Sequence, residues 1–238
     1  MIRKNSSWIV LRIFNASLSL AALIFLGGCT SIQTTARDGN LEEVKRQLAW
    51  GVNVNSESLR MHNTALHMSA YKGHVEIVKY LLEKGANPNV RQESGVTPLA
   101  FAAIGGHTEV MEILIAHGAN PNLSVVMELA ARGGHVEAVK ILLEHGADIN
   151  VKVTDGGTAL TVAVSRQHVE LVKFLLSKGA DVNARVYGKT LLWLAYYKDD
   201  VTIGRILLQH GANPTMECKG RTLPPSYLEK LHEEGLSE

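Results

Sequence analysis

Cysteine is scarce in this sequence, with only Cys29 and Cys218 among 238 residues. Cys29 closes an N-terminal segment of distinct composition, so Cys218 is the only thiol in the rest of the chain. The chain after Cys29 therefore cannot form a disulfide within itself, and an oxidising compartment places no demand on its folding. We interpret Cys218 as an inert residue near the end of the chain rather than a redox centre.

Neither sign of charge is in clear excess. Lys and Arg number 24 and Asp and Glu 23, which gives a net charge of +1. The segment before Cys29 holds three basic and no acidic residues, so the chain from Cys29 onward carries 21 basic and 23 acidic residues, or −2. Aromatic residues make up only 5%, and no stripe of Lys and Arg with aromatic platforms stands out. We therefore expect no nucleic-acid partner.

A repeated motif is what the sequence does contain. Gly-Ala-Asn/Asp-x-Asn stands at residues 85–89, 118–122, 146–150 and 179–183, with looser copies at 51–55 and 211–215. From the first glycine of one copy to that of the next, the steps along the chain are 34, 33, 28, 33 and 32. A period near 33 predicts a solenoid of stacked units rather than a globular core around one catalytic cleft.

Each unit is predicted to fold as a pair of helices, most clearly over residues 97–122. Thr97 can cap a helix, and Pro98 suits the first helical position. A Gly-Gly-His turn at 105–107 separates this helix from a second one, whose apolar residues are spaced three and four apart. Gly118 ends the second helix, because a left-handed conformation costs glycine nothing.

These motifs resemble the ankyrin repeat. The resemblance rests on Thr-Pro-Leu-x-x-Ala-Ala at 97–103, Gly-His-x-Glu-x-Val at 73–78 and Leu-Leu-x-x-Gly-Ala-Asn-x-Asn at 81–89. It implies an all-α solenoid of stacked helix-turn-helix units with short β-hairpin fingers. The domain would span 34–238, as about six repeats and a degenerate C-terminal cap. It also implies a non-catalytic module that binds a protein partner on the concave face of fingers and first helices.

One unit departs from the period. The short step between Gly118 and Gly146 shows a loss between Asn122 and Leu129, where a finger and a capping Thr are expected. We predict that residues 124–128 lack this finger and leave a notch midway along the binding face. A deletion without functional consequence in a variable loop is the alternative.

The repeat also accounts for most residues that could suggest catalysis. Ten histidines invite a metal hypothesis, but most recur at two fixed positions of the unit: His74, His107, His135 and His168 in the turns, and His117, His145 and His210 before the helix-ending glycines. Glu76, Glu109, Glu137 and Glu170 recur near the start of second helices, where they suit the helix dipole. No phosphate loop or nucleophile elbow is present. We predict no metal site, no cofactor and no enzymatic activity.

Residues 1–28 resemble a bacterial lipoprotein signal peptide. A basic start is followed by a largely apolar run over 13–25, and Leu-Gly-Gly precedes Cys29. The resemblance implies cleavage before Cys29, lipidation of its thiol, an acyl chain such as palmitate on the new amine, and a lipidated tether over 29–33. Thr30, rather than Asp, after the cysteine favours the outer membrane, with the chain facing the periplasm.

Two alternatives compete for this segment. Residues 8–28 are about long enough for an uncleaved membrane anchor, although Arg12 and Asn15 inside the run argue against burial in lipid. An ordinary secretory signal with an incidental cysteine is the other possibility, but no small-x-small cleavage site is obvious.

Candidate binding residues follow from the positions that vary in the ankyrin pattern. Basic and aromatic side chains gather there, before the turns and on the fingers, and such residues steer and anchor acidic partners. The predicted partner-binding residues are Tyr71, Lys72, Arg91, Ile104, Arg132, Lys152, Arg166, Arg185, Tyr187, Tyr197 and Lys198. A solvated charged face is the alternative. Trp193 is interpreted as packing within the penultimate repeat.

The function predicted from these features is stoichiometric binding of a protein partner, with an acidic surface, by a monomer anchored to the bacterial envelope through its N-terminal lipid. One role is that of an immunity or inhibitor protein against an effector acting in the periplasm. A scaffold or stabiliser of an envelope enzyme or assembly is the alternative. A structural spacer without a specific ligand is a third.

Overall fold

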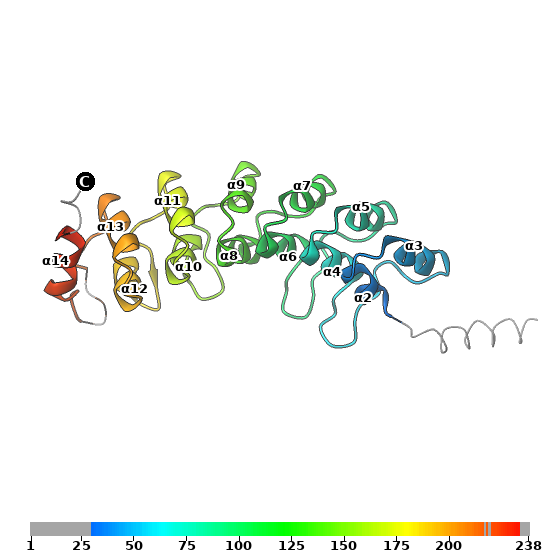
Figure 1. The fold of residues 1–238 in the computed structure, drawn as a ribbon, viewed down its shortest axis with the longest axis horizontal. Helices are drawn as coiled ribbons and strands as arrows, with labels where there is room; N and C mark the ends of the chain where they lie inside the picture. Colours follow the sequence, from blue (N-terminus) through cyan, green and yellow to red (C-terminus); the bar gives the residue numbers. More distant parts are fainter. Residues whose placement is uncertain (1–29, 217, 219, 234–238) are drawn as a thin grey trace, which may run out of the picture.

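The computed structural model describes residues 30–216, 218 and 220–233, and these form an elongated stack of helix pairs (Figure 1). The predicted leader and Cys29 lie outside the described residues. The first helices of the pairs form one row: α2 (Ile32–Arg37), α4 (Ala65–Lys72), α6 (Pro98–Gly105), α8 (Ser124–Gly133), α10 (Ala159–Ser165) and α12 (Leu191–Tyr197). The second helices form the other: α3 (Leu41–Ala49), α5 (Val75–Glu83), α7 (Thr108–Ala116), α9 (Val136–Glu144), α11 (Val169–Ser177) and α13 (Val201–Gln209).

Each helix contacts the next helix of its own row and the partner of its own pair, so the predicted all-α solenoid is confirmed. Small residues on the first helices allow the close approach: Ala65, Ala70, Ala102, Ala103, Ala130 and Ala131 are fully buried. Thr97 caps α6 by accepting a hydrogen bond from the backbone N–H of Ala100, as predicted. Helix α2 begins at Ile32, inside the segment predicted as a tether and ahead of the predicted start of the domain.

The finger loops depart in part from the expected β-hairpins. Among the described residues, only the finger before α12 has paired strands, β1 (Arg185–Val186) and β2 (Lys189–Thr190), which are antiparallel. Tyr187 and Gly188 form its two-residue turn, with φ of 51° and 75°, and two positive φ angles are what a tight hairpin turn requires. The other fingers contain turns without strand pairing.

One side of the stack is joined by a row of histidine rings, which we call the His ladder. Nε2 of His74, His107, His135 and His168 lies 2.9 to 3.1 Å from a backbone carbonyl of the preceding repeat, in turn Arg37, Tyr71, Ile104 and Arg132. The ladder continues without a gap past the short repeat. These recurrent histidines therefore join neighbouring repeats.

A second row of bonds, the Asn ladder, joins the loops that follow the second helices. Asn89 shows the pattern: its Nδ2 donates to Gly118 O at 2.7 Å, and its Oδ1 accepts from Asn120 N at 2.9 Å. Asn55, Asn150 and Asn183 likewise accept from the backbone of the next repeat. Asn122 occupies the same position, yet within the described chain it has no such bond to the next repeat. The Asn ladder is thus interrupted at the short step.

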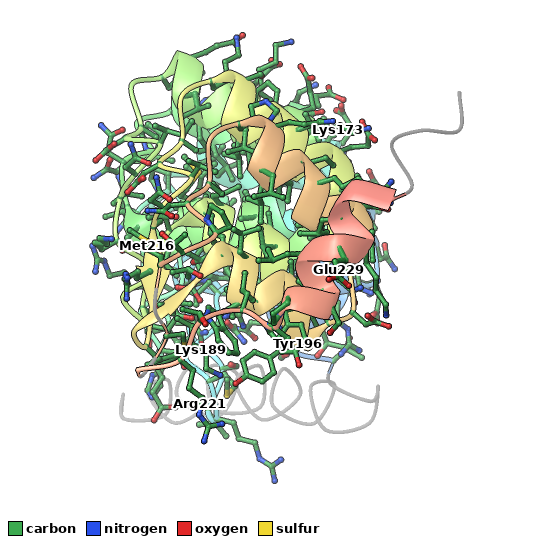
Figure 2. The ribbon with its side chains drawn as sticks, turned by 90° about the vertical axis from the view of Figure 1, so that its left-hand side faces the viewer. Lys173, Lys189, Tyr196, Met216, Arg221 and Glu229 are labelled. Carbon is green, nitrogen blue, oxygen red and sulfur yellow. The ribbon has the colours of Figure 1, made fainter. Side chains whose placement is uncertain are left out.

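The far end of the stack is closed by α14 (Pro225–Glu233), which lies against α13. Figure 2 views this end and shows Glu229 of α14 on its outer side. Tyr227 packs its ring 5.1 Å from that of Tyr196 and donates its hydroxyl to Asp200 O at 3.0 Å. Burial, with added repulsion from Asp200 and Asp199, raises the pKa of Tyr227 to about 12. Cys218 is buried and forms no disulfide, and its interpretation as an inert residue stays a prediction.

Candidate protein-binding face

The candidate binding surface consists of the first-row helices and the finger parts of the loops, residues 55–64, 88–97, 151–158 and 184–190, which we call the finger face. In Figure 1 these loops project below the first-row helices, on the side away from the second row. Their spacing is uneven, because the connection between α7 and α8 has only residues 117–123, whereas the preceding connection, between α5 and α6, has residues 84–97. The missing finger predicted from the sequence is confirmed.

The short connection changes the start of the helix that follows. Helix α8 has Leu123 at its N-cap, without a side-chain hydrogen bond, whereas α4, α6 and α12 each have a capping Thr. Val125 and Leu129 of α8 are only partly buried. The notch is therefore a place where a first-row helix is not flanked by a finger of its own.

A buried carboxylate braces the next finger at this point. Glu128 is 7% exposed and accepts hydrogen bonds from Thr154 N at 3.0 Å and Thr154 Oγ1 at 2.6 Å. Its other oxygen lies 2.6 Å from Nη2 of Arg132. Charge-assisted bonds of this kind are stronger than neutral ones. Glu128 thus ties α8 to the finger before α10, a role that the sequence did not predict.

The predicted basic residues differ in how available they are. Arg132 is exposed but paired with Glu128, so it belongs partly to the framework. Lys72 ends α4, while Arg166 and Lys198 are the C-caps of α10 and α12, and all three side chains are exposed. The other predicted basic residues, Arg91, Lys152 and Arg185, are also exposed and lie on three fingers.

Aromatic residues lie on the same face. Tyr71 is 43% exposed and packs edge-on against Phe101, with ring centroids 5.6 Å apart. Near the other end of the row, Tyr187 is 74% and Tyr197 60% exposed. Lys189 holds its Nζ 4.6 Å from the centre of the Tyr197 ring and so links the hairpin to the end of α12. Phe101 and Lys189 were not among the predicted binding residues. Ile104 was predicted, but its side chain is only partly exposed.

Two residues at corresponding positions of the first helices serve packing. Trp193 is 5% exposed and lies 5.5 Å from the ring of Tyr196, which agrees with its interpretation as a packing residue. His67 is fully buried; its Nδ1 accepts from Thr64 N and its Nε2 donates to Val96 O, both at 3.1 Å. Burial lowers the pKa of His67 to about 4, against the smaller upward effect of the Val96 carbonyl.

The described part of the chain contains no group of three or more metal-ligating side chains. None of its helices is long and apolar enough to cross a bilayer. A hollow of about 330 Å³ lies away from the predicted binding residues, among Leu48, Ala49, Val52, Val54, Tyr80 and Lys84 of the first two repeats.

Comparison with known proteins agrees with this architecture. Four overlapping segments, residues 15–92, 32–125, 88–153 and 127–218, match the family described as Ankyrin repeats (3 copies), and the chain belongs to the ankyrin-repeat family. The crystal structure of the human ASB11 ankyrin repeat domain is similar, with a TM-score of 0.78 and 31% identity over 86% of this chain and 97% of that one.

Similar segments also occur in much longer curated proteins. The chain is 38% identical over 77 residues to E3 ubiquitin-protein ligase XBAT32 of Arabidopsis thaliana, which is 30% of this chain and 15% of that protein. It is 36% identical over 76 residues to Alpha-latrotoxin-Lhe1a of Latrodectus hesperus, 32% of this chain and 5% of the toxin. The chain thus spans a small part of these relatives. Ankyrin repeats generally mediate protein–protein interaction and are typically non-catalytic.

Proposed function

We propose that this chain is a lipid-anchored envelope protein that binds an acidic protein partner on its finger face. One observation carries the proposal: exposed Lys, Arg and Tyr side chains recur on this face from α4 to α12, while the second-row helices pair their lysines with glutamates. Lys79, Lys140 and Lys173 each lie 2.9 to 3.2 Å from the glutamate three residues earlier. Lys72, Arg166 and Lys198, at the ends of three first-row helices, have no ion pair with a carboxylate among the described residues and are therefore more available to a bound protein.

The notch gives this face a shape specific to the chain. A loop or helix end of the partner fits where the connection 117–123 replaces a finger, beside Val125 and Leu129, with basic residues on the neighbouring repeats. Apolar contact in the centre and charge at the rim is the usual distribution in protein interfaces. The notch therefore favours a partner of complementary shape over general adhesion to acidic surfaces.

The binding test uses two triple variants of equal charge change. Lys72→Glu/Arg166→Glu/Lys198→Glu reverses the finger face and spares Arg132, whose reversal would put a second carboxylate against buried Glu128. Lys79→Glu/Lys140→Glu/Lys173→Glu reverses the second row. Crosslinked capture from envelope extract, read by quantitative mass spectrometry, should give a saturable partner that is lost only with the first variant. Equal capture by both variants, or no saturable protein, contradicts the proposal.

The proposed role is that of an inhibitor of an effector that acts in the periplasm. Binding on a broad concave face suits stoichiometric blocking of another protein. The captured partner's activity should fall in proportion to added chain and reach its minimum at equimolar amounts. An active partner in the saturated complex would favour the scaffold role instead.

The proposed anchor is a lipid on Cys29, a residue outside the described part of the chain. The leader's basic start, apolar run and Leu-Gly-Gly-Cys end support it. Palmitate should label the wild type in a Gram-negative host but not Cys29→Ser. Label retained by Cys29→Ser contradicts lipidation at this residue.

A further inference from the structure

An exposed tryptophan marks the end of the stack nearest the leader. Trp50, the C-cap of α3, is 65% exposed, and Val52 in the following loop is 38% exposed. Beside them lies the hollow of about 330 Å³ formed by Leu48, Ala49, Val52, Val54 and others. Trp193, by contrast, is 5% exposed. Tyr80 and Lys84 of the second repeat complete the lining of this hollow, so the exposed apolar side chains lie beside the junction of the first two repeats.

The first described residue is bound to the helix that carries Trp50. Nε2 of Gln47, a buried residue of α3, donates to Thr30 O at 3.1 Å and also lies 3.3 Å from Oγ1 of Thr35. Thr35 Oγ1 in turn donates to Thr30 Oγ1 at 3.4 Å. The chain therefore enters the fold against α3, at a fixed point.

The distances from this point are short. A lipid on residue 29 is attached one peptide unit from Thr30, about 3.8 Å between Cα atoms. Trp50 lies three residues beyond Gln47 along the α3 axis, a rise of about 4.5 Å. A lipid at this position would bring the Trp50 end of the domain to the bilayer surface, because no long tether separates them.

We propose that Trp50 and Val52 form a membrane-contacting patch that rests in the headgroup region of the bilayer. The occupant is thus a lipid surface. The inference deepens the proposed function, because it rests on lipidation of Cys29. Tryptophan favours the membrane–water interface, where its amphipathic ring sits at headgroup level. A second, weaker contact beside a lipid anchor strengthens attachment and fixes orientation.

Charge contributes little to this contact. Arg46 lies with its guanidinium 5.3 Å from the centre of the Trp50 ring but pairs with Glu43, and Lys45 pairs with Glu42 at 2.7 Å. Lys84 stands over Tyr80 at 5.3 Å, beside exposed Glu83. Basic and acidic groups thus balance around the patch. Contact should accordingly depend on the apolar side chains and persist at high salt.

The orientation that follows suits a binding protein. The patch belongs to the first repeat, and α14 closes the opposite end of the stack (Figure 1). Contact through Trp50 would hold the first repeat on the bilayer. The patch shares no residue with the first-row helices from α4 to α12, so contact through it does not occupy them.

The test uses the full chain with Trp193→Phe, purified from membranes of a Gram-negative host. Trp8 belongs to the leader, so Trp50 is the only fluorophore of this kind after cleavage. The protein is reconstituted into phosphatidylcholine–phosphatidylglycerol vesicles with brominated acyl chains, and mass spectrometry reads its N-terminus. Trp50 emission should shift to shorter wavelength and lose most of its intensity to bromines near the carbonyl end of the chains, at low and high salt alike.

The matched control is Trp50→Phe with Trp193 retained, whose buried ring should not be quenched. It also supplies the Trp50 signal by difference from the wild type, should Trp193→Phe fail to fold. A lipidated N-terminus with unquenched, water-like Trp50 emission overturns the inference and leaves the proposed anchor standing. Burial of Trp50 only on addition of a protein overturns it in favour of a protein contact. An N-terminus without lipid overturns both.

Discussion

The hydrogen bonds between repeats differ on the two sides of the stack at the short repeat. On the turn side, the His ladder runs from His74 to His168 without a gap. Along the loops after the second helices, the Asn ladder is interrupted at Asn122 and resumes at Asn150, and a finger is absent between α7 and α8, within the part of the chain that the structure describes. The turn side therefore keeps its contacts between repeats across the short step, whereas the loops on the other side lose one of theirs. The repeated contacts form the framework, and the irregular step lies on the proposed binding face.

The largest effect is expected where a methyl group is added next to a ring of the His ladder. Gly106 has a φ of 68°, and a Cβ there would lie 2.6 Å from Nδ1 of His135. Gly106→Ala should cost about 3 to 4 kcal/mol, from the left-handed conformation and a displaced ring. Gly118→Ala, with a φ of 86° and nothing within 4 Å, should cost only about 1 to 2 kcal/mol. Urea unfolding measures both, and equal costs would show that the ring contact is unimportant.

Acid should lower the free energy of unfolding through His67, a buried residue of α4. Its pKa is about 4 in the folded protein and 6.5 in the unfolded chain, so between these values only the unfolded chain takes up the proton. The contribution is complete above about pH 6.5 and is lost as the pH falls towards 4, a loss of about 3 kcal/mol. Urea unfolding at pH 7 and pH 4.5 should show a smaller pH effect in His67→Gln. The same pH effect in both proteins would contradict the assignment.

Removal of the brace beside the notch should have a smaller effect. Glu128→Ala deletes the bonds to Thr154 and Arg132, and we expect a loss of about 2 kcal/mol. Hydrogen exchange should accelerate over residues 151–157. Glu137→Ala, which removes an exposed partner of Lys140, should change stability by less than about 0.5 kcal/mol. Unchanged exchange over 151–157 in Glu128→Ala would mean that the finger holds its position without the carboxylate.

The smallest expected difference in stability is between alanine variants of two equivalent asparagines, Asn89 in the Asn ladder and Asn122 at its interruption. Asn89→Ala breaks two bonds between repeats and should cost about 1 to 2 kcal/mol. Asn122→Ala breaks none of this kind within the described chain and should cost less than about 0.5 kcal/mol. Thermal unfolding of the two variants measures the difference. Equal losses would mean that the ladder is not interrupted at the notch.

The fold could be predicted because its signals are local and repeated. Thr97 and Pro98, the Gly-His turns and the helix-ending glycines each act within one unit, and the short step after Gly118 was enough to predict the missing finger. The Glu128 brace could not be predicted, because it joins residues 26 positions apart through side-chain geometry. The Lys189–Tyr197 contact likewise depends on the one described finger that forms a hairpin. Trp50 occupies the position before a helix-ending glycine, where His117, His145 and His210 stand in other repeats. Its exposure, and the bond between Gln47 and Thr30, could not be predicted from that pattern.

The most direct test of the finger face is its hydrogen-exchange footprint in the complex with the captured partner. Binding should slow exchange in residues 88–97, 117–128, 151–157 and 184–190 and leave α5, α7, α9 and α11 unchanged. Protection confined to the second-row helices, or none on the finger face in a saturated complex, would contradict the account.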